Sequence, residues 1–220
     1  MMFRSKSFNI DQPLASGSLT RAQSFSEKWP SSVNVRASIV IKEVNPQEAL
    51  AAMREIREEM MSNGWGCSSH AGNDDSEQKK WNSRFAKAHS ILGSIRINAR
   101  QAVPRENSSF FVAYFRGTPI GGLQLSSSDN TPTDFPKVNY LATHCGIRDC
   151  GVLLIEQAVN KSQQLGKNGN LKLQAVIDAV PAYVKMGFVT TESYMELRPI
   201  EKNDEWKYDG ITNTYRYKFI

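Results

Sequence analysis

Residues 141–154 read Leu-Ala-Thr-His-Cys-Gly-Ile-Arg-Asp-Cys-Gly-Val-Leu-Leu. The β-prone run ahead of them predicts a strand over 138–143, and the apolar periodicity behind them predicts a helix over 151–165. A strand that turns tightly into a helix gathers free backbone N–H groups and the positive end of the helix dipole at one point. Gly151 would let an anion approach the backbone closely, and Arg148 could add a positive charge. The stretch therefore predicts an anion site, with an ordinary strand–loop–helix connection as the alternative.

The rest of the chain alternates between strand and helix patterns around this stretch. Asn45 and Pro46 are typical of the N-cap and first position of a helix. The patterns predict strands over 35–44, 110–115, 120–125, 138–143, 171–176, 188–197 and 215–219, and helices from Pro46 and over 77–92, 151–165 and 181–186. This order predicts an α/β fold with a mixed central sheet and helices on both faces.

Composition divides the chain into two parts. Residues 1–34 are rich in serine and lack apolar periodicity, which predicts a flexible N-terminal segment, with a secretion or targeting segment as the sharper reading. Residues 35–220 form the predicted folded domain. The three cysteines form no zinc pattern, so we expect no metal and a reducing, cytoplasmic compartment, with secretion into a host cell as the alternative.

Charge and hydropathy limit the classes of partner that the chain could bind. The formal net charge of +5 is too small, and too loosely distributed, to indicate nucleic-acid binding. No apolar run approaches the ~18 residues that a membrane span needs, so we expect no membrane partner.

Two further stretches of the sequence bear on the fold and the function. Residues 179–188 read Ala-Val-Pro-Ala-Tyr-Val-Lys-Met-Gly-Phe, in which Gly187 is typical of a helix C-terminus. Residues 110–123 read Phe-Phe-Val-Ala-Tyr-Phe-Arg-Gly-Thr-Pro-Ile-Gly-Gly-Leu, which predicts a hairpin with its turn at 116–119.

Together these stretches resemble the GNAT superfamily of N-acetyltransferases over about residues 36–220. The hairpin is similar to the second and third strands of the family, and residues 179–188 fill each named position of its Ala-x-x-x-Tyr-x-x-x-Gly-Phe signature. The acetyl-CoA loop of the family, Gln/Arg-x-x-Gly-x-Gly/Ala, is matched at its Arg and first Gly by Arg148, Asp149, Cys150, Gly151, Val152 and Leu153.

The resemblance implies the function and the site. We expect a GNAT-type enzyme that transfers an acetyl group from acetyl-CoA, its co-substrate, to a primary amine of a small molecule, peptide or protein. The resemblance makes Tyr183 the general acid for the departing thiolate, and it assigns the pantetheine arm to the backbone of Leu141, Ala142 and Thr143. It places the acceptor cleft near Trp65 and residues 199–213. His144 and Glu192 are candidate bases, with a structural role favoured for the histidine.

Two alternatives stay open. Leu153 stands where the family has Gly or Ala, and Asp149 where Gly is common, so a non-catalytic GNAT-fold binding module is one alternative. The other is a thiol enzyme, because a helix N-terminus would lower the pKa of Cys150, with His89 and Glu106 as its partners.

Overall fold

The computed structural model describes residues 35–62, 76–101, 107–127, 134–144 and 150–219. Its main helices are α2 (Pro46–Ser62), α3 (Ser76–Gln101), α4 (Cys150–Gln164) and α5 (Val180–Lys185), with the short helices α1 (Val35–Ser38), η1 (Ile177–Ala179) and η2 (Pro199–Glu201). Its strands are β1 (Ile39–Val44), β2 (Ser108–Phe115), β3 (Thr118–Ser126), β4 (Lys137–Thr143), β5 (Leu171–Leu173), β6 (Val189–Thr190), β7 (Met195–Leu197), β8 (Trp206–Asp209) and β9 (Thr214–Tyr217).

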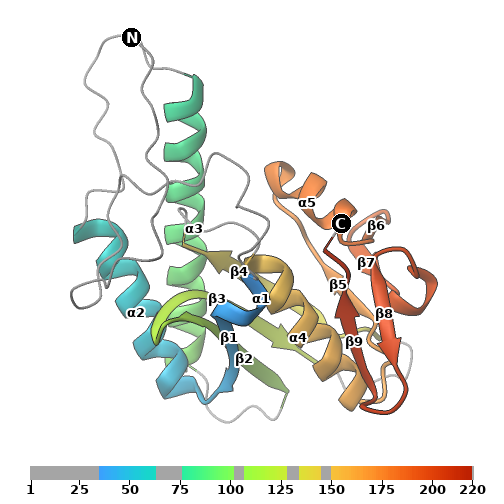
Figure 1. Ribbon diagram of the computed structural model, residues 1–220. Coiled ribbons are helices and arrows are strands. Elements are labelled where there is room, and N and C mark those ends of the chain that lie inside the picture. The colour runs from blue at the N-terminus through green and yellow to red at the C-terminus, as the bar shows by residue number, and fades with distance from the viewer. Residues whose placement is uncertain (1–34, 63–75, 102–106, 128–133, 145–149, 220) are drawn as a thin grey trace.

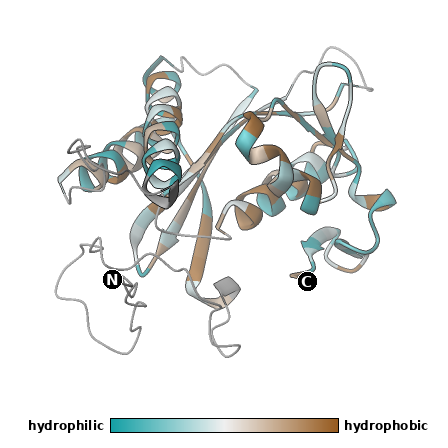
Figure 2. Ribbon diagram, turned by 90° about the horizontal axis from the view of Figure 1, so that it is seen from above, coloured by the Kyte–Doolittle hydropathy of each residue, from teal (hydrophilic) through white to brown (hydrophobic). Residues whose placement is uncertain are grey.

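Seven strands form one sheet in the order β1-β2-β3-β4-β5-β7-β6, and β8 and β9 form a separate two-stranded sheet. Neighbours in the large sheet are antiparallel except β4 and β5, which are parallel. Helices α2 and α3 cover one face and α4 covers the other (Figures 1 and 2). The predicted α/β fold with a mixed central sheet is confirmed.

Strand β2 shows how the sequence divides its side chains between the two faces. Phe110 and Val112 lie in the cluster under α2 and α3, whereas Phe111 and Ala113 lie in the cluster under α4. Such alternation follows from the two-residue period of a strand. The predicted hairpin is confirmed, and its turn has positive φ at both Arg116 (49°) and Gly117 (85°), as a type I′ turn requires.

Helix α2 begins where the sequence predicts. Asn45 accepts a hydrogen bond from Glu48 N through Oδ1 at 2.9 Å, and Asn45 N donates to Glu48 Oε2 at 3.2 Å. This reciprocal pair is a capping box, which satisfies two backbone donors at the helix start. The side chains of Met53, Ile56 and Met60 are fully buried against the sheet, as their spacing predicts.

Three boundaries differ from the prediction. Strand β5 ends at Leu173 rather than at Val176. The expected first strand starts with the short helix α1, so β1 begins only at Ile39. Helix α3 continues to Gln101 instead of ending at Leu92, because Ile95 and Ala99 extend its buried face.

Gly93 lies inside α3 and packs against α2. A Cβ built on it would lie 3.4 Å from the Cζ of Arg57, so the glycine leaves room for a guanidinium group of α2.

The C-terminal region differs more. The expected strand over 188–197 is two short strands, because Thr191 and Tyr194 close a turn between β6 and β7. Strand β8 was missed, and Trp206 at its start is buried and donates Nε1–H to Met186 O at 2.8 Å.

Strand β9 has β8 on one edge and side chains of α4 on the other. Asn160 accepts from Tyr215 N at 2.7 Å and donates to Tyr215 O at 3.1 Å. Glu156, which is buried, accepts from Tyr217 N at 2.7 Å. The helix therefore continues the hydrogen-bond ladder of a strand with two polar side chains.

Close packing between α2 and β3 depends on Gly122. A Cβ built there would lie 2.5 Å from Cε and 2.7 Å from Sδ of Met53, whose side chain is fully buried. We predict that Gly122→Ala lowers the free energy of unfolding by about 1–3 kcal/mol, measured by urea denaturation.

The contact itself is tested by adding Met53→Ala, which removes the clashing atoms. The double variant should then lose less free energy of unfolding than the sum of the losses of the two single variants. A loss equal to that sum would contradict the contact. Gly210→Ala is the control, since its Cβ would meet no atom closer than 3.8 Å, and it should change stability by less than about 0.5 kcal/mol.

Candidate active site

The parallel strands β4 and β5 part soon after they meet. They pair only at Lys137–Lys172 and Val138–Leu173, because β5 ends at Leu173. On its other edge β4 stays paired with β3 as far as Thr143. Within the described strands, the backbone of Leu141, Ala142 and Thr143 therefore has a strand neighbour on one edge only.

A bulge in β4 lies at the point of parting. The register between β3 and β4 jumps from Gln124–Tyr140 to Leu125–Val138, which leaves Asn139 as the extra residue. Its side-chain Nδ2 donates to Ser126 Oγ at 3.0 Å. Since a bulge bends its strand and increases its local twist, it helps to turn the end of β4 away from β5.

Helix α4 begins beside this open edge. A Cβ built on Gly151 would lie 3.6 Å from Cδ2 of Leu141, so the first turn of α4 and the end of β4 are neighbours. The first N–H groups of a helix have no partner within the helix and carry its positive dipole. Arg148 and Asp149, which the sequence places in the same site, lie outside the described residues.

The side chains in this first turn divide between core and gap. Cys150 and Leu153 are buried in the core cluster, whereas Gly151 and Val152 are only partly buried. The bulk of Leu153 therefore points into the core and leaves only its backbone for an anion.

The geometry argues against a thiol enzyme. Burial raises the pKa of the Cys150 thiol to about 12, so the thiolate is absent at neutral pH. His89 lies on α3, which covers the opposite face of the sheet. Glu106 lies outside the described residues.

Tyr183 is held by the way in which α5 ends. Phe188 N donates to Tyr183 O at 3.1 Å, and Gly187 N donates to Val184 O at 2.9 Å. With Gly187 at a φ of 91°, this pair of bonds is a Schellman motif. The rings of Tyr183 and Phe188 meet edge to face at 5.5 Å, which is the apolar contact that accompanies the motif. The spacing Tyr-x-x-x-Gly-Phe thus holds the tyrosine ring in place through backbone hydrogen bonds and a ring contact. The hydroxyl group takes no part in this motif.

The hydroxyl group of Tyr183 is left available. No described residue hydrogen-bonds to it, although the ring packs on the core cluster. Burial raises the pKa of Tyr183 to about 12, so the phenol keeps its proton at neutral pH. The side chain can therefore act as a hydrogen-bond or proton donor.

An ion pair joins the two sides of the gap. Lys87 of α3, a helix that packs on β4, binds Asp178 of η1, which follows β5. Sequence reasoning missed this pair, and no local signal could have found it, because the partners are 91 residues apart. Both side chains are largely exposed, so the pair contributes little stability.

The other expected site residues have different outcomes. His144 is fully buried, and burial lowers its pKa to about 4, which favours the structural role. Glu192 is exposed in the turn between β6 and β7 rather than on a strand. In the expected acceptor cleft, Trp206 is a core residue, Tyr208 is partly exposed and donates to Asn213 Oδ1 at 2.7 Å, and Trp65 lies outside the described residues.

Two kinds of site are not found in the described part of the chain. It has no cluster of three or more His, Cys, Asp or Glu side chains placed to hold a metal ion. None of its helices combines the length and the hydropathy that a membrane-spanning helix requires.

The fold resembles solved acetyltransferases at low sequence identity. The PaiA N-acetyltransferase from Thermoplasma acidophilum, solved with coenzyme A, is 20% identical with a TM-score of 0.42, and the match covers 72% of this chain and 96% of that one. A GNAT-family acetyltransferase from Streptococcus pneumoniae is 16% identical with a TM-score of 0.44, over 72% and 98% of the two chains. A GNAT-family acetyltransferase from Brucella melitensis, solved with acetyl-CoA, is 14% identical with a TM-score of 0.41, over 72% and 86%.

No protein-family profile matches the sequence, and no curated protein matches it. Two of the three structures are described as GNAT-family enzymes, the family whose motifs this sequence resembles.

The burial of His144 predicts a pH dependence of stability. In the unfolded chain this side chain takes up a proton near pH 6.5, but in the folded chain only near pH 4. Its contribution is therefore complete above pH 6.5 and is lost as the pH falls to about 4, a loss of about 3 kcal/mol. Urea denaturation across this window should show a smaller loss for His144→Gln than for the wild type.

The comparison between variants matters because carboxyl groups also titrate in this window. His89→Gln is the control, since that side chain is less buried, and it should leave most of the pH dependence in place. Parallel wild-type and His144→Gln curves would show that His144 does not carry the effect.

Proposed function

We propose that this chain is a GNAT-type N-acetyltransferase that transfers an acetyl group from acetyl-CoA to a primary amine. The observation that carries the proposal is the parting of β4 and β5 directly beside the start of α4. This arrangement offers a strand edge and a helix N-terminus side by side, which suits a ligand that has amides at one end and phosphates at the other.

The residues around the gap fit acetyl-CoA. The open edge of Leu141, Ala142 and Thr143 would pair with the amides of the pantetheine arm, as an added strand pairs with a sheet. The free N–H groups at the start of α4 would bind the diphosphate, with Gly151 allowing close approach. Arg148 is proposed to add its charge there. Acetyl-CoA supplies the acetyl group as a thioester.

Tyr183 is proposed to hold a proton at Oη for the departing sulfur. In the balanced reaction a C–N bond forms, the C–S bond breaks, the amine loses one proton and the sulfur gains one. A phenol with a pKa of about 12 is a weaker acid than a thiol, whose usual pKa is about 8.5. Tyr183 therefore donates a hydrogen bond to the sulfur, and its proton moves only as another proton from the amine replaces it.

The acceptor and the location are proposed from the sequence only. The amine belongs to a small molecule, a peptide or a protein. A cytoplasmic location stays a prediction from the cysteines, and secretion into a host cell as an effector stays a prediction from the composition of residues 1–34.

Gly151→Ala tests whether the glycine is required for binding acetyl-CoA or for folding. The added methyl group would make an ordinary contact with Leu141, and alanine is a better helix former by up to about 1 kcal/mol. We predict that the free variant melts at or above the wild-type temperature but gains less than the wild type when acetyl-CoA is added. Differential scanning fluorimetry with acetyl-CoA, free CoA and ATP measures both effects.

Each result of that titration has a meaning. No stabilisation of the wild type by any acyl-CoA would overturn the proposal and favour a non-catalytic binding module. Equal stabilisation of wild type and Gly151→Ala would remove the start of α4 from the binding site.

Tyr183→Phe tests the hydroxyl group alone. The phenyl ring keeps the contact with Phe188, so we expect unchanged stability and an acetyl-CoA affinity within about twofold of wild type. Turnover should fall about 10²-fold or more, because the proton donor is lost.

The assay follows release of the CoA thiol with a lysine peptide, a polyamine and an aminoglycoside as acceptors. Phe188→Leu is the matched control, because it disturbs the ring contact but keeps the hydroxyl group. Turnover of Tyr183→Phe equal to that of the wild type would show that the tyrosine serves only to end α5.

A further inference from the structure

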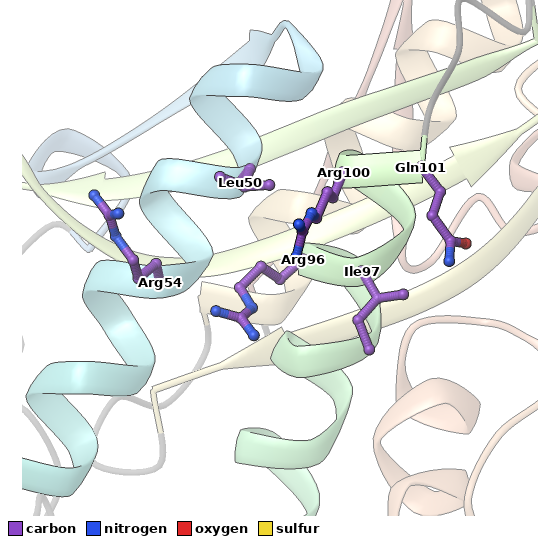
Figure 3. Close-up of a pocket in the computed structure, with 6 residues that line it drawn as sticks. All are labelled: Leu50, Arg54, Arg96, Ile97, Arg100 and Gln101. Atoms are coloured by element: carbon purple, nitrogen blue, oxygen red, sulfur yellow. The ribbon is translucent and has the colours of Figure 1, made fainter.

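A groove of about 490 Å³ lies between α2 and α3, outside the candidate active site. It is lined by Leu50, Arg54, Arg96, Ile97, Arg100 and Gln101 (Figure 3). These residues belong to the first half of α2 and the end of α3. In Figure 1 that end of the helix pair lies toward the bottom of the view, whereas α5 lies at the upper right.

The arginines of the groove lack good acidic partners. No described carboxylate forms an ion pair with Arg96 or Arg100. Arg54 has Glu58 at 3.9 Å, but both side chains are exposed, so this pair is weak. Arg57 lies one turn further along α2, and its pKa is lowered by burial and then by repulsion from Arg96. The groove thus holds a concentration of positive charge that the carboxylates of the described residues compensate only weakly.

Helix α3 is the source of much of this charge. Of its six basic residues, Arg96 and Arg100 line the groove, and its single acidic residue, Glu77, is near its start. Helix α2 has several acidic residues, but two of them lie outside the groove. The pKa of Tyr114 is raised by burial and then by Glu48 and Glu55, and neither of these exposed glutamates lines the groove.

The groove also has an apolar part. Leu50 and Ile97 line it, and the side chain of Ile97 is 52% exposed. A large apolar side chain that stays in solvent beside Arg96 and Arg100, which pair with no described carboxylate, suits a ligand with both acidic and apolar groups.

The spread of the charges indicates the shape of that ligand. Figure 3 shows the guanidinium groups of Arg54, Arg96 and Arg100 at separate points along the groove rather than gathered around one centre. Arg96 and Arg100 are one helical turn apart, or about 6 Å along the axis. That spacing matches two carboxylates four residues apart on a helix or two apart on an extended chain. It does not match the compact geometry of a single phosphate group.

We propose that the groove between α2 and α3 docks an acidic segment of a partner protein, with Arg96 and Arg100 binding its carboxylates and Leu50 and Ile97 its apolar side chains. The proposal does not rest on acetyl transfer. If the acceptor of the reaction is a protein, the groove would hold that protein at a distance from the acetylated amine.

The test uses a fluorescein-labelled peptide with glutamates four residues apart and leucines between them, measured by fluorescence anisotropy at low salt. We expect binding in the micromolar range that weakens as salt is added, because the charges are partly exposed. The double variant Arg96→Glu/Arg100→Glu should bind at least tenfold more weakly. The same peptide with glutamine in place of glutamate should bind neither protein.

The control is Lys79→Glu/Arg84→Glu, which makes the same change in net charge on the same helix but outside the groove. It should bind within about twofold of wild type, which excludes a general effect of charge. Both variants should keep the wild-type response to acetyl-CoA, so failure of this proposal is distinguishable from failure of the proposed function.

Three results would overturn the proposal. The first is no binding of the acidic peptide up to millimolar concentration. The second is equal weakening by the groove and control variants. The third is that the protein binds inorganic triphosphate but not the peptide, and that Arg96→Glu/Arg100→Glu abolishes the triphosphate binding. The groove would then bind a compact anion.

Discussion

The short pairing between β4 and β5 is the constraint on which the candidate site depends. Two pairs of residues hold the halves of the sheet together, and beyond them the strands separate. Each strand stays anchored on its far side, β4 to β3 and β5 to β7, so the gap widens without loosening the sheet. A longer β5 would close the edge of β4 with protein backbone. The early end of β5 at Leu173 is therefore what leaves room for a ligand.

Several neighbouring elements shape the surroundings of that gap. The bulge at Asn139 bends β4 where the pairing stops. The start of α4 lies against Leu141. Lys87 and Asp178 span the boundary between the two half-sheets. Backbone N–H and C=O groups cost free energy when they are buried without partners. At the end of β4 and the start of α4 such groups are available to a ligand.

Much of the fold could be predicted from the sequence because its signals are local. The Asn45–Pro46 helix start, the Arg116–Gly117 turn and the Gly187 helix end each depend on a few adjacent residues. The errors arose where the outcome depends on distant contacts. The predicted helix ends at Leu92, whereas packing of Ile95 and Ala99 continues α3 to Gln101. Trp206 resembles a cleft residue until its bond to Met186 is known. Of the candidate site, the sequence identifies the start of α4 and Tyr183. It does not reveal that Leu153 points into the core or that Lys87 meets Asp178, because both depend on how the layers pack.

The bonds from α4 to β9 make the last strand a structural part of the helix rather than an appendage. Glu156 is a buried carboxylate, and its oxygen receives Tyr217 N; Asn160 is satisfied by both polar atoms of the Tyr215 backbone. A chain that stopped before Thr214 would leave the buried carboxyl group of Glu156 and the half-buried amide of Asn160 without these partners, which would cost stability. Loss of β9 would therefore destabilise α4 as well as the two-stranded sheet. The same bonds occupy an edge of β9 that could otherwise recruit a strand from another molecule.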